Sequence, residues 1–98
     1  MHRRTKALQI PMAVKQKVYL RDNGTCIWCG SAGDPVVHYI AKSQGGLGIE
    51  ENIVCGCYYC HMQYDQTDKR EQYREKAREY LKSKYPDWDE SKLYYKKW

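Results

Sequence analysis

The chain contains no phenylalanine and few large aliphatic side chains, although it has ten tyrosines and three tryptophans among its 98 residues. It also lacks an apolar run long enough to span a membrane, an internal repeat and a long low-complexity segment. We therefore expect one small domain that is not embedded in a membrane. Its shortage of apolar side chains leaves it a limited core, so it needs another source of stability.

A secretory signal is also absent. The first residues are basic, but no apolar stretch of signal-peptide length follows them. We therefore expect a reducing, cytoplasmic location, where cysteines are more often metal ligands than disulfide partners.

What the chain does have is two C-x-x-C pairs, at residues 26–29 and 57–60. Two intervening residues let one tight turn present both sulfurs to a single ion, and Zn²⁺ prefers four tetrahedral thiolates. A disulfide framework is the alternative, and the missing signal disfavours it. We predict a structural zinc ion, which would supply the folding free energy that the core lacks. Its ligands would be Cys26, Cys29, Cys57 and Cys60, while the fifth cysteine, Cys55, is expected to be a small buried apolar residue.

The net charge of +5 is unevenly placed along the chain. Residues 1–25 contain six Lys or Arg and one Asp, residues 26–65 one Lys and four acidic residues, and residues 66–98 ten basic and seven acidic residues. An acidic centre between basic flanks suits a metal site whose flanking basic residues bind a polyanion. Solvated surface residues produce the same pattern. The candidates for nucleic-acid contact are Arg3, Arg4, Lys6, Lys15 and Lys42.

Local patterns predict the elements around the cysteines. We expect a helix over residues 11–20, ended by the turn at residues 22–24, where Asn and Gly tolerate left-handed backbone. Short strands are predicted at 36–40 and 53–55, because both stretches are rich in β-branched residues. A short helix should begin at Cys60.

The last third of the chain predicts a second helix. Apolar and aromatic residues recur at helical spacing over residues 69–84, and Asp68 with Glu71 resembles a capping box at its start. Pro86 ends it. The tail over residues 87–98 contains Trp88, Leu93 and Trp98, so we expect it to pack back on the domain.

Three polar residues near the cysteines have the side chains that phosphodiester hydrolysis requires. A neutral imidazole can take a proton from water near pH 7, and a divalent cation can stabilise the phosphorane and the leaving oxygen. His38 is the candidate base and His61 the candidate ligand of the catalytic ion. Asn52 is the candidate brace, because its amide can bond backbone on both sides of a loop. Each of these residues taken alone is more often structural.

Taken together, these motifs resemble the HNH endonuclease family, in its four-cysteine form and particularly its small phage-encoded members. The resemblance covers residues 18–65. It rests on five motifs in order: a basic or polar helix, then RDNGTCIWCG at 21–30, HYIAKSQGG at 38–46, ENIV at 51–54 and CYYCH at 57–61.

The resemblance implies a fold and an activity. It implies a ββα-metal finger of the α+β class, with a structural zinc and flanking helices, spanning the single domain 1–98. Residues 1–10 would be a basic arm, 11–66 the helix and metal-finger core, and 67–98 a C-terminal helix and tail. Family members cut DNA in bacteria or phage-infected cells, so the implied partners are double-stranded DNA and a second copy or phage packaging or recombination proteins.

One position departs from the family pattern. The residue before the catalytic His is often an Asp or His that also binds the catalytic ion, and here it is Val37. Mg²⁺ or Mn²⁺ would then be held by His61 with water and substrate phosphate, with help from Asp65 or Asp34. The alternative is a decayed site in a zinc module that binds DNA or protein without cutting, or a purely structural zinc domain.

Overall fold

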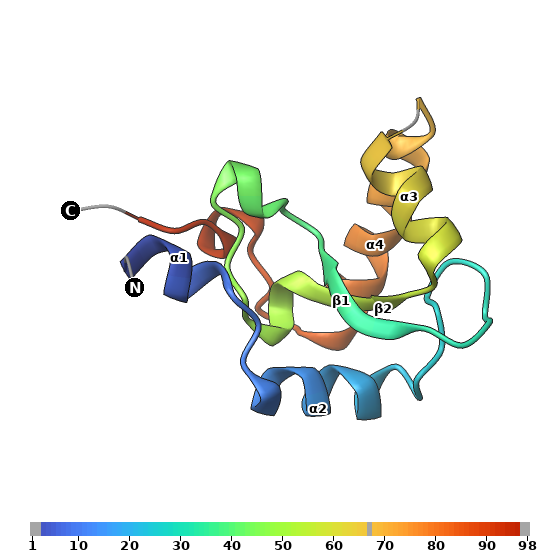
Figure 1. Cartoon of the computed structure of the whole chain (residues 1–98), viewed down its shortest axis with the longest axis horizontal. Helices are drawn as coiled ribbons and strands as arrows, with labels where there is room; N and C mark the ends of the chain where they lie inside the picture. The colour runs from blue at the N-terminus through green and yellow to red at the C-terminus, as the bar shows by residue number, and fades with distance from the viewer. Residues whose placement is uncertain (1–2, 67, 97–98) are drawn as a thin grey trace.

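The computed structural model describes residues 3–66 and 68–96, and its helices surround a two-stranded antiparallel sheet (Figure 1). The predicted small α+β domain is confirmed. The helices are α1 (Arg3–Leu8), α2 (Met12–Arg21), α3 (Tyr58–Gln66) and α4 (Arg70–Lys84), and the strands are β1 (Asp34–His38) and β2 (Ile53–Gly56). Short 3₁₀ helices are η1 (Lys42–Gln44), η2 (Glu50–Asn52) and η3 (Glu90–Leu93).

Both predicted strands are present and pair as an antiparallel hairpin, but the ends of β1 differ from the prediction. In the register, Val37 pairs with Val54 and His38 with Ile53. The strand ends at His38 rather than at residue 40, because the backbone N–H of Ile40 donates to the side chain of Asn52 instead of to a strand (2.8 Å). A bulge between Asp34 and Val37 accommodates Pro35, which has no N–H to donate.

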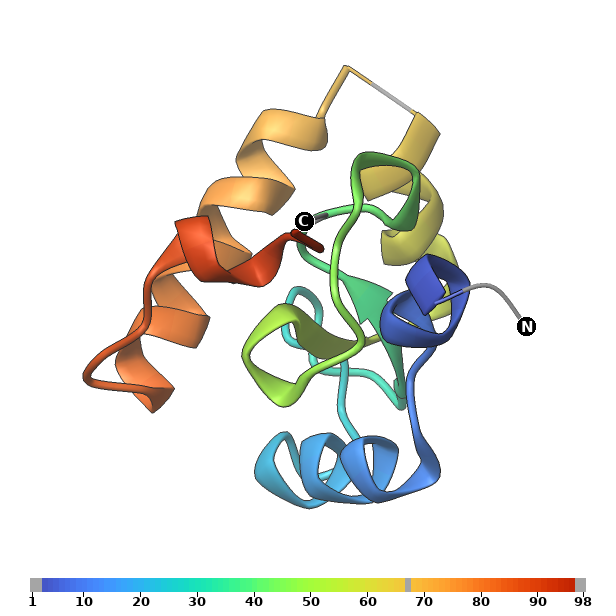
Figure 2. The same cartoon turned by 90° about the vertical axis from the view of Figure 1, so that its left-hand side faces the viewer.

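Helices cover both faces of the hairpin: α2 lies on one side, and α3 and α4 lie on the other (Figures 1 and 2). Side chains of a strand alternate between faces, so successive residues of β2 enter two different apolar clusters. Ile53 and Cys55 pack with Val18 of α2, whereas Val54 packs with Ala77 and Leu81 of α4. Cys55 is fully buried, so its predicted role as an apolar core residue is confirmed.

The helix boundaries follow the local signals with three exceptions. Asn23 and Gly24 have positive φ and end α2, as predicted. However, α3 begins at Tyr58 rather than Cys60, and Pro11 precedes the first turn of α2 instead of lying in it. The predicted capping box is wrong: Lys69, not Asp68, occupies the N-cap of α4, and the side chain at that position makes no capping hydrogen bond.

Both ends of the described chain pack onto the domain. Trp88 and Leu93 join the core that α4 covers, and Leu93 accepts a hydrogen bond from the N–H of Leu47, so the predicted return of the tail is confirmed. Trp98 lies outside the described residues. The segment expected to be an arm contains α1, whose Leu8 is buried. Among the described residues, no helix is long and apolar enough to cross a membrane.

A buried ion pair joins α2 to the rest of the fold. The guanidinium of Arg21 donates to both oxygens of Asp22 (2.7 and 3.0 Å) and to the carbonyl of Ile53 (2.7 Å). Asp22 also accepts from the N–H of Cys55 (2.9 Å) and from the hydroxyl of Tyr80. Burial opposes ionisation of Asp22, but these donors outweigh it and lower the pKa of the carboxyl below its usual value.

This pair predicts a pH-dependent effect of Asp22→Asn. At neutral pH we expect a loss of about 2 kcal/mol in unfolding free energy, because hydrogen bonds to a buried carboxylate are worth about 1.5–3 kcal/mol. The stabilisation by a carboxyl with a lowered pKa is present above its unfolded pKa, about 3.9, and is lost as the pH falls through the folded value. The difference between wild type and variant should therefore shrink below about pH 4.

Urea unfolding at fixed zinc concentration would measure this difference. Asp34→Asn is the control, because Asp34 is exposed at the start of β1. Equal unfolding free energies of Asp22→Asn and Asp34→Asn at pH 7 would show that Asp22 is not the source of the stabilisation.

Candidate functional site

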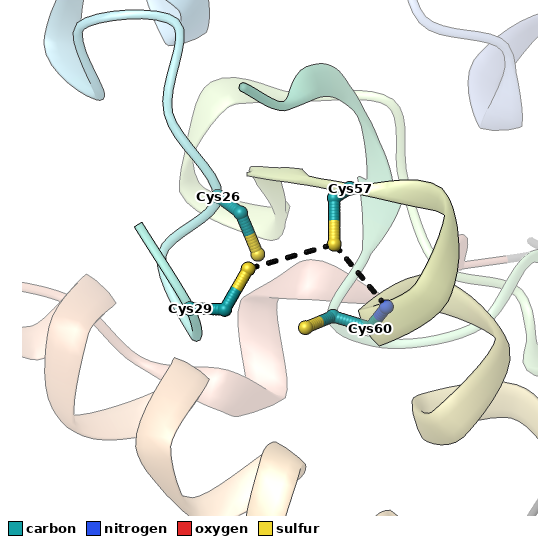
Figure 3. A group of neighbouring side chains, drawn as sticks. All are labelled: Cys26, Cys29, Cys57 and Cys60. Atoms are coloured by element: carbon teal, nitrogen blue, oxygen red, sulfur yellow. Dashed lines mark hydrogen bonds between the residues drawn. The ribbon is translucent and has the colours of Figure 1, made fainter. Parts of the chain in front are cut away.

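Four cysteine sulfurs converge between the first turn after α2 and the start of α3 (Figure 3). The sulfurs of Cys26, Cys29, Cys57 and Cys60 all lie within 4.8 Å of one another, and those of Cys29 and Cys57 are 3.6 Å apart. Ligands at 2.3 Å from a tetrahedral ion are separated by about 3.8 Å. Disulfide-bonded sulfurs would be about 2 Å apart. The four thiols could therefore hold a structural metal such as zinc.

The first pair sits on a tight turn. The N–H of Gly30 donates to the carbonyl of Cys26 (2.9 Å), and Cys26 in turn donates its N–H to the carbonyl of Ser31 (2.6 Å). Gly30 has a φ of 81°, which glycine adopts without the strain that a side chain would add. The turn therefore brings both sulfurs to one side.

The second pair forms the first turn of α3. Cys57 occupies the position before the helix, and its sulfur accepts the backbone N–H of Cys60 (3.4 Å), as a polar cap residue would. This cap explains why α3 begins before Cys60. The same segment therefore presents the second cysteine pair and begins the helix.

The surroundings of the thiols favour thiolate at two of them. Hydrogen bonds from Ser31 lower the pKa of Cys29 to about 6, and the N–H of Cys60 lowers the pKa of Cys57. Burial raises the pKa of Cys60. A bound cation would offset that cost, because metal binding and thiol deprotonation are coupled.

An open cleft of about 420 Å³ lies between the end of β1, α3 and α4. It brings together His38 and His61, which sequence analysis assigned to catalysis, and Asp65, which it offered as a metal ligand. His61 and Asp65 follow His38 in the chain by 23 and 27 positions, so it is the fold that brings the three residues together. Lys42, Arg70 and Arg74 also line the cleft.

His38 is half-buried at the end of β1, and its Nε2 lies 2.9 Å from the carbonyl oxygen of Leu8. Burial is the largest influence on the ring and lowers its pKa; Lys42 acts in the same direction, and the Leu8 carbonyl only partly opposes them. The imidazole is therefore neutral near pH 7, as a base must be.

Asn52 lies in the core and braces the loop that follows His38. Its side chain accepts the N–H of Ile40 (2.8 Å) and donates to the carbonyls of Ile40 (3.2 Å) and Leu47 (2.8 Å). In addition, the carbonyl of Asn52 accepts the N–H of Tyr39 (2.7 Å). This is the bracing geometry expected of Asn52.

We predict that Asn52→Ala lowers the unfolding free energy by about 3 kcal/mol, because three buried backbone groups lose their partner at a cost of about 1–3 kcal/mol each before water enters. Thermal or urea unfolding would measure the change. Asn23→Gly is the matched control, since Asn23 is exposed at positive φ and glycine adopts that conformation readily. Equal stabilities of the two variants would contradict the bracing role.

His61 and Asp65 lie one turn apart on α3, with His61 Nε2 3.1 Å from Asp65 Oδ2. Adjacent ligands of an octahedral ion bound at about 2.1 Å are about 3.0 Å apart, so the two side chains could share such an ion. Val37 offers no ligand, because its side chain is aliphatic, and it is buried in the core. Asp34 pairs with Gly56 at the opposite end of β1 and is not among the described side chains that line the cleft.

The basic candidates are distributed around His38. Lys42 lines the cleft and also a neighbouring hollow of about 400 Å³, where it is joined by Lys15. Lys6 is exposed on α1 and lines neither, and the side chains of Arg3 and Arg4 lie outside what the structure describes.

Two cleft residues, Arg70 and Arg74, were not identified from the sequence. Arg70 is held at the end of α3 by the carbonyls of Tyr64 (3.2 Å) and Asp65 (2.7 Å). Arg70 and Arg74 are four residues apart, a spacing that predicts that both lie on one face of a helix. It could not indicate that this face meets the histidines.

Comparison with known proteins found no matching family model, no matching curated protein and no matching solved structure.

Proposed function

We propose that this protein is a metal-dependent DNA endonuclease or nickase whose fold is held by structural zinc. The observation that carries the proposal is the cleft, in which a neutral imidazole, a His–carboxylate pair and three basic side chains face the same space. The order of β1, β2 and α3 and the HNH-like motifs support a ββα-metal fold for the catalytic core.

The chemistry assigned to the cleft is hydrolysis of one phosphodiester. His38 takes a proton from water as the water oxygen bonds to phosphorus, and the bond from phosphorus to the 3′-oxygen breaks. The products are a 5′-phosphate and a 3′-hydroxyl, whose proton comes from solvent. Asn52 keeps the His38 loop in place during this step, and general-base help of this kind is worth about 10²–10⁴ in rate.

His61 and Asp65 would hold the catalytic Mg²⁺ or Mn²⁺. The ion would neutralise charge on the phosphoryl oxygens and the leaving oxygen. Two protein ligands suffice for Mg²⁺, which commonly keeps several waters and binds substrate phosphate directly. This arrangement compensates for the missing ligand at Val37.

The basic side chains of the cleft favour a polyanionic substrate. Lys42, Arg70 and Arg74 line the cleft that contains His38, and Lys15 extends the positive surface past His38 into the neighbouring hollow. Contacts to phosphates position a nucleic acid without reading its sequence, so they suit a nuclease of low intrinsic specificity.

Zinc is proposed for the four-cysteine site because a closed set of four thiolates with a tetrahedral arrangement is typical of structural zinc.

A buried Val37 specifically favours one alternative, a zinc module that binds DNA or a protein partner but no longer cuts. That alternative predicts salt-dependent binding without cleavage.

Incubation of supercoiled plasmid with zinc-loaded protein tests the proposal. Nicked or linear plasmid is expected with Mg²⁺ or Mn²⁺ but not with zinc alone, and the ends should carry 5′-phosphate. Intact plasmid at every metal concentration, with the protein folded and bound to DNA, would refute the nuclease and leave the binding module.

A further inference from the structure

The ring of His38 is contacted by a segment outside the region of HNH-like motifs. Its Nε2 lies 2.9 Å from the carbonyl oxygen of Leu8, the last residue of α1. A carbonyl oxygen has no proton to give, so in the neutral ring Nε2 must be the donor. The other nitrogen, Nδ1, is then the unprotonated one.

We infer that the C-terminal end of α1 is a positioning element of the active site: the Leu8 carbonyl holds His38 as the Nε2–H tautomer and leaves Nδ1 to accept the proton of water. The inference rests on the proposed function for its catalytic meaning, but the tautomer itself does not depend on catalysis. It predicts that the N-terminal segment contributes to turnover, and not only through charge.

The segment is held firmly enough for this role. Leu8 is buried, and the carbonyl of the preceding Ala7 accepts the N–H of Gly48 (3.0 Å). Gly48 allows this approach, because a Cβ at that position would overlap the carbonyl of Gln9. Ile10 then packs against the cluster formed by α2 and β2, so both sides of the Leu8 carbonyl are anchored.

The environment of His38 explains why a fixed tautomer matters. Two hollows meet at this residue: the catalytic cleft, and the smaller one lined by Gln9, Ile10, Lys15 and Lys42. A free ring could present either nitrogen to either side. With Nε2 bound to Leu8, only one nitrogen remains for substrate water, and only one proton-transfer geometry is available.

The test compares Gln9→Pro with Gln9→Ala. Residue 9 is exposed, so both substitutions spare the core. Proline disfavours helical geometry at the preceding residue and removes the N–H that Gln9 donates to Thr5 and Lys6, and both effects move the Leu8 carbonyl. Alanine retains the backbone. Gly48→Ala is a second way to displace the segment, from the opposite side.

The first readout is the long-range ¹⁵N–¹H NMR spectrum of the imidazoles, recorded without DNA or divalent metal other than zinc. The chain has only three histidines, so His38 can be assigned with the alanine variants of His38 and His61. Wild type and Gln9→Ala should show the Nε2–H tautomer of His38, and Gln9→Pro and Gly48→Ala a mixture. The second readout is nicking, where Gln9→Pro should lower kcat about 10–100-fold, the loss typical of an orienting partner, with KM little changed.

An Nδ1–H tautomer in the wild type, or identical spectra and rates for Gln9→Pro and Gln9→Ala, would overturn the inference. A protein that cuts no DNA but loses the Nε2–H tautomer in Gln9→Pro would refute the nuclease and support the contact. The two failures are therefore distinguishable.

Discussion

His38→Ala is expected to lower plasmid nicking about 10³-fold while leaving the fold and the zinc content unchanged. The expectation follows from the position of the ring: it lies at the wall of the cleft, is neutral near pH 7 because burial lowers its pKa, and has one nitrogen in use by Leu8. The described residues that line the cleft include no other imidazole except His61, which is paired with Asp65. Among the described residues of the cleft, none is an equivalent base that could replace it.

The measurement is initial nicking rate against protein concentration at saturating Mg²⁺ or Mn²⁺. Ser43→Ala is a matched control, because Ser43 also lines the cleft but has no titratable group. Unchanged binding of plasmid by His38→Ala would separate loss of chemistry from loss of affinity. If His38→Ala nicks plasmid at the wild-type rate, His38 is not the general base, whatever metal the reaction requires.

Cys60→Ala is expected to abolish tight metal binding and leave the protein largely unfolded at 25 °C. Structural zinc contributes apparent binding free energies of about 10–16 kcal/mol in zinc-finger peptides, which matches or exceeds the whole stability of an ordinary small domain. Here the ion would join the turn after α2 to the start of α3, two segments about 30 residues apart in a chain with a small core. Chelation of the wild-type protein should have the same effect.

Cys55→Ala is the matched control for this prediction. Cys55 is buried two residues before Cys57, but its sulfur is not part of the four-cysteine group, and burial raises its pKa to about 12. Its replacement should cost only about 1 kcal/mol, the scale of a small core truncation. Co²⁺ titration followed by thiolate absorption, with circular dichroism, would measure both effects. Equal folding of the two cysteine variants in the presence of zinc, or a wild-type protein that stays folded after chelation, would contradict a structural role for the ion.

Local signals predicted the parts of the fold that depend on a few neighbouring residues. The turn at Asn23 and Gly24 and the amphipathic helix ending before Pro86 were predicted, because each reflects backbone preference or periodicity over one or two turns. The burial of Cys55 was predicted because a free cysteine behaves as a small apolar residue. One of the errors has a long-range cause and another has a local one. β1 ends early because Asn52 takes the backbone groups of Ile40, and α3 starts early because a cysteine sulfur caps it.

By itself, the sequence determined the four-thiol group and the chemistry available to His38, Asn52 and His61, because ligand type, spacing and side-chain pKa are properties of the residues. Only the tertiary structure decided that Arg70 and Arg74 face the histidines and that Leu8 contacts His38. The first depends on how α4 packs beside α3. The second uses a backbone carbonyl, which every residue has, so no residue pattern could mark it.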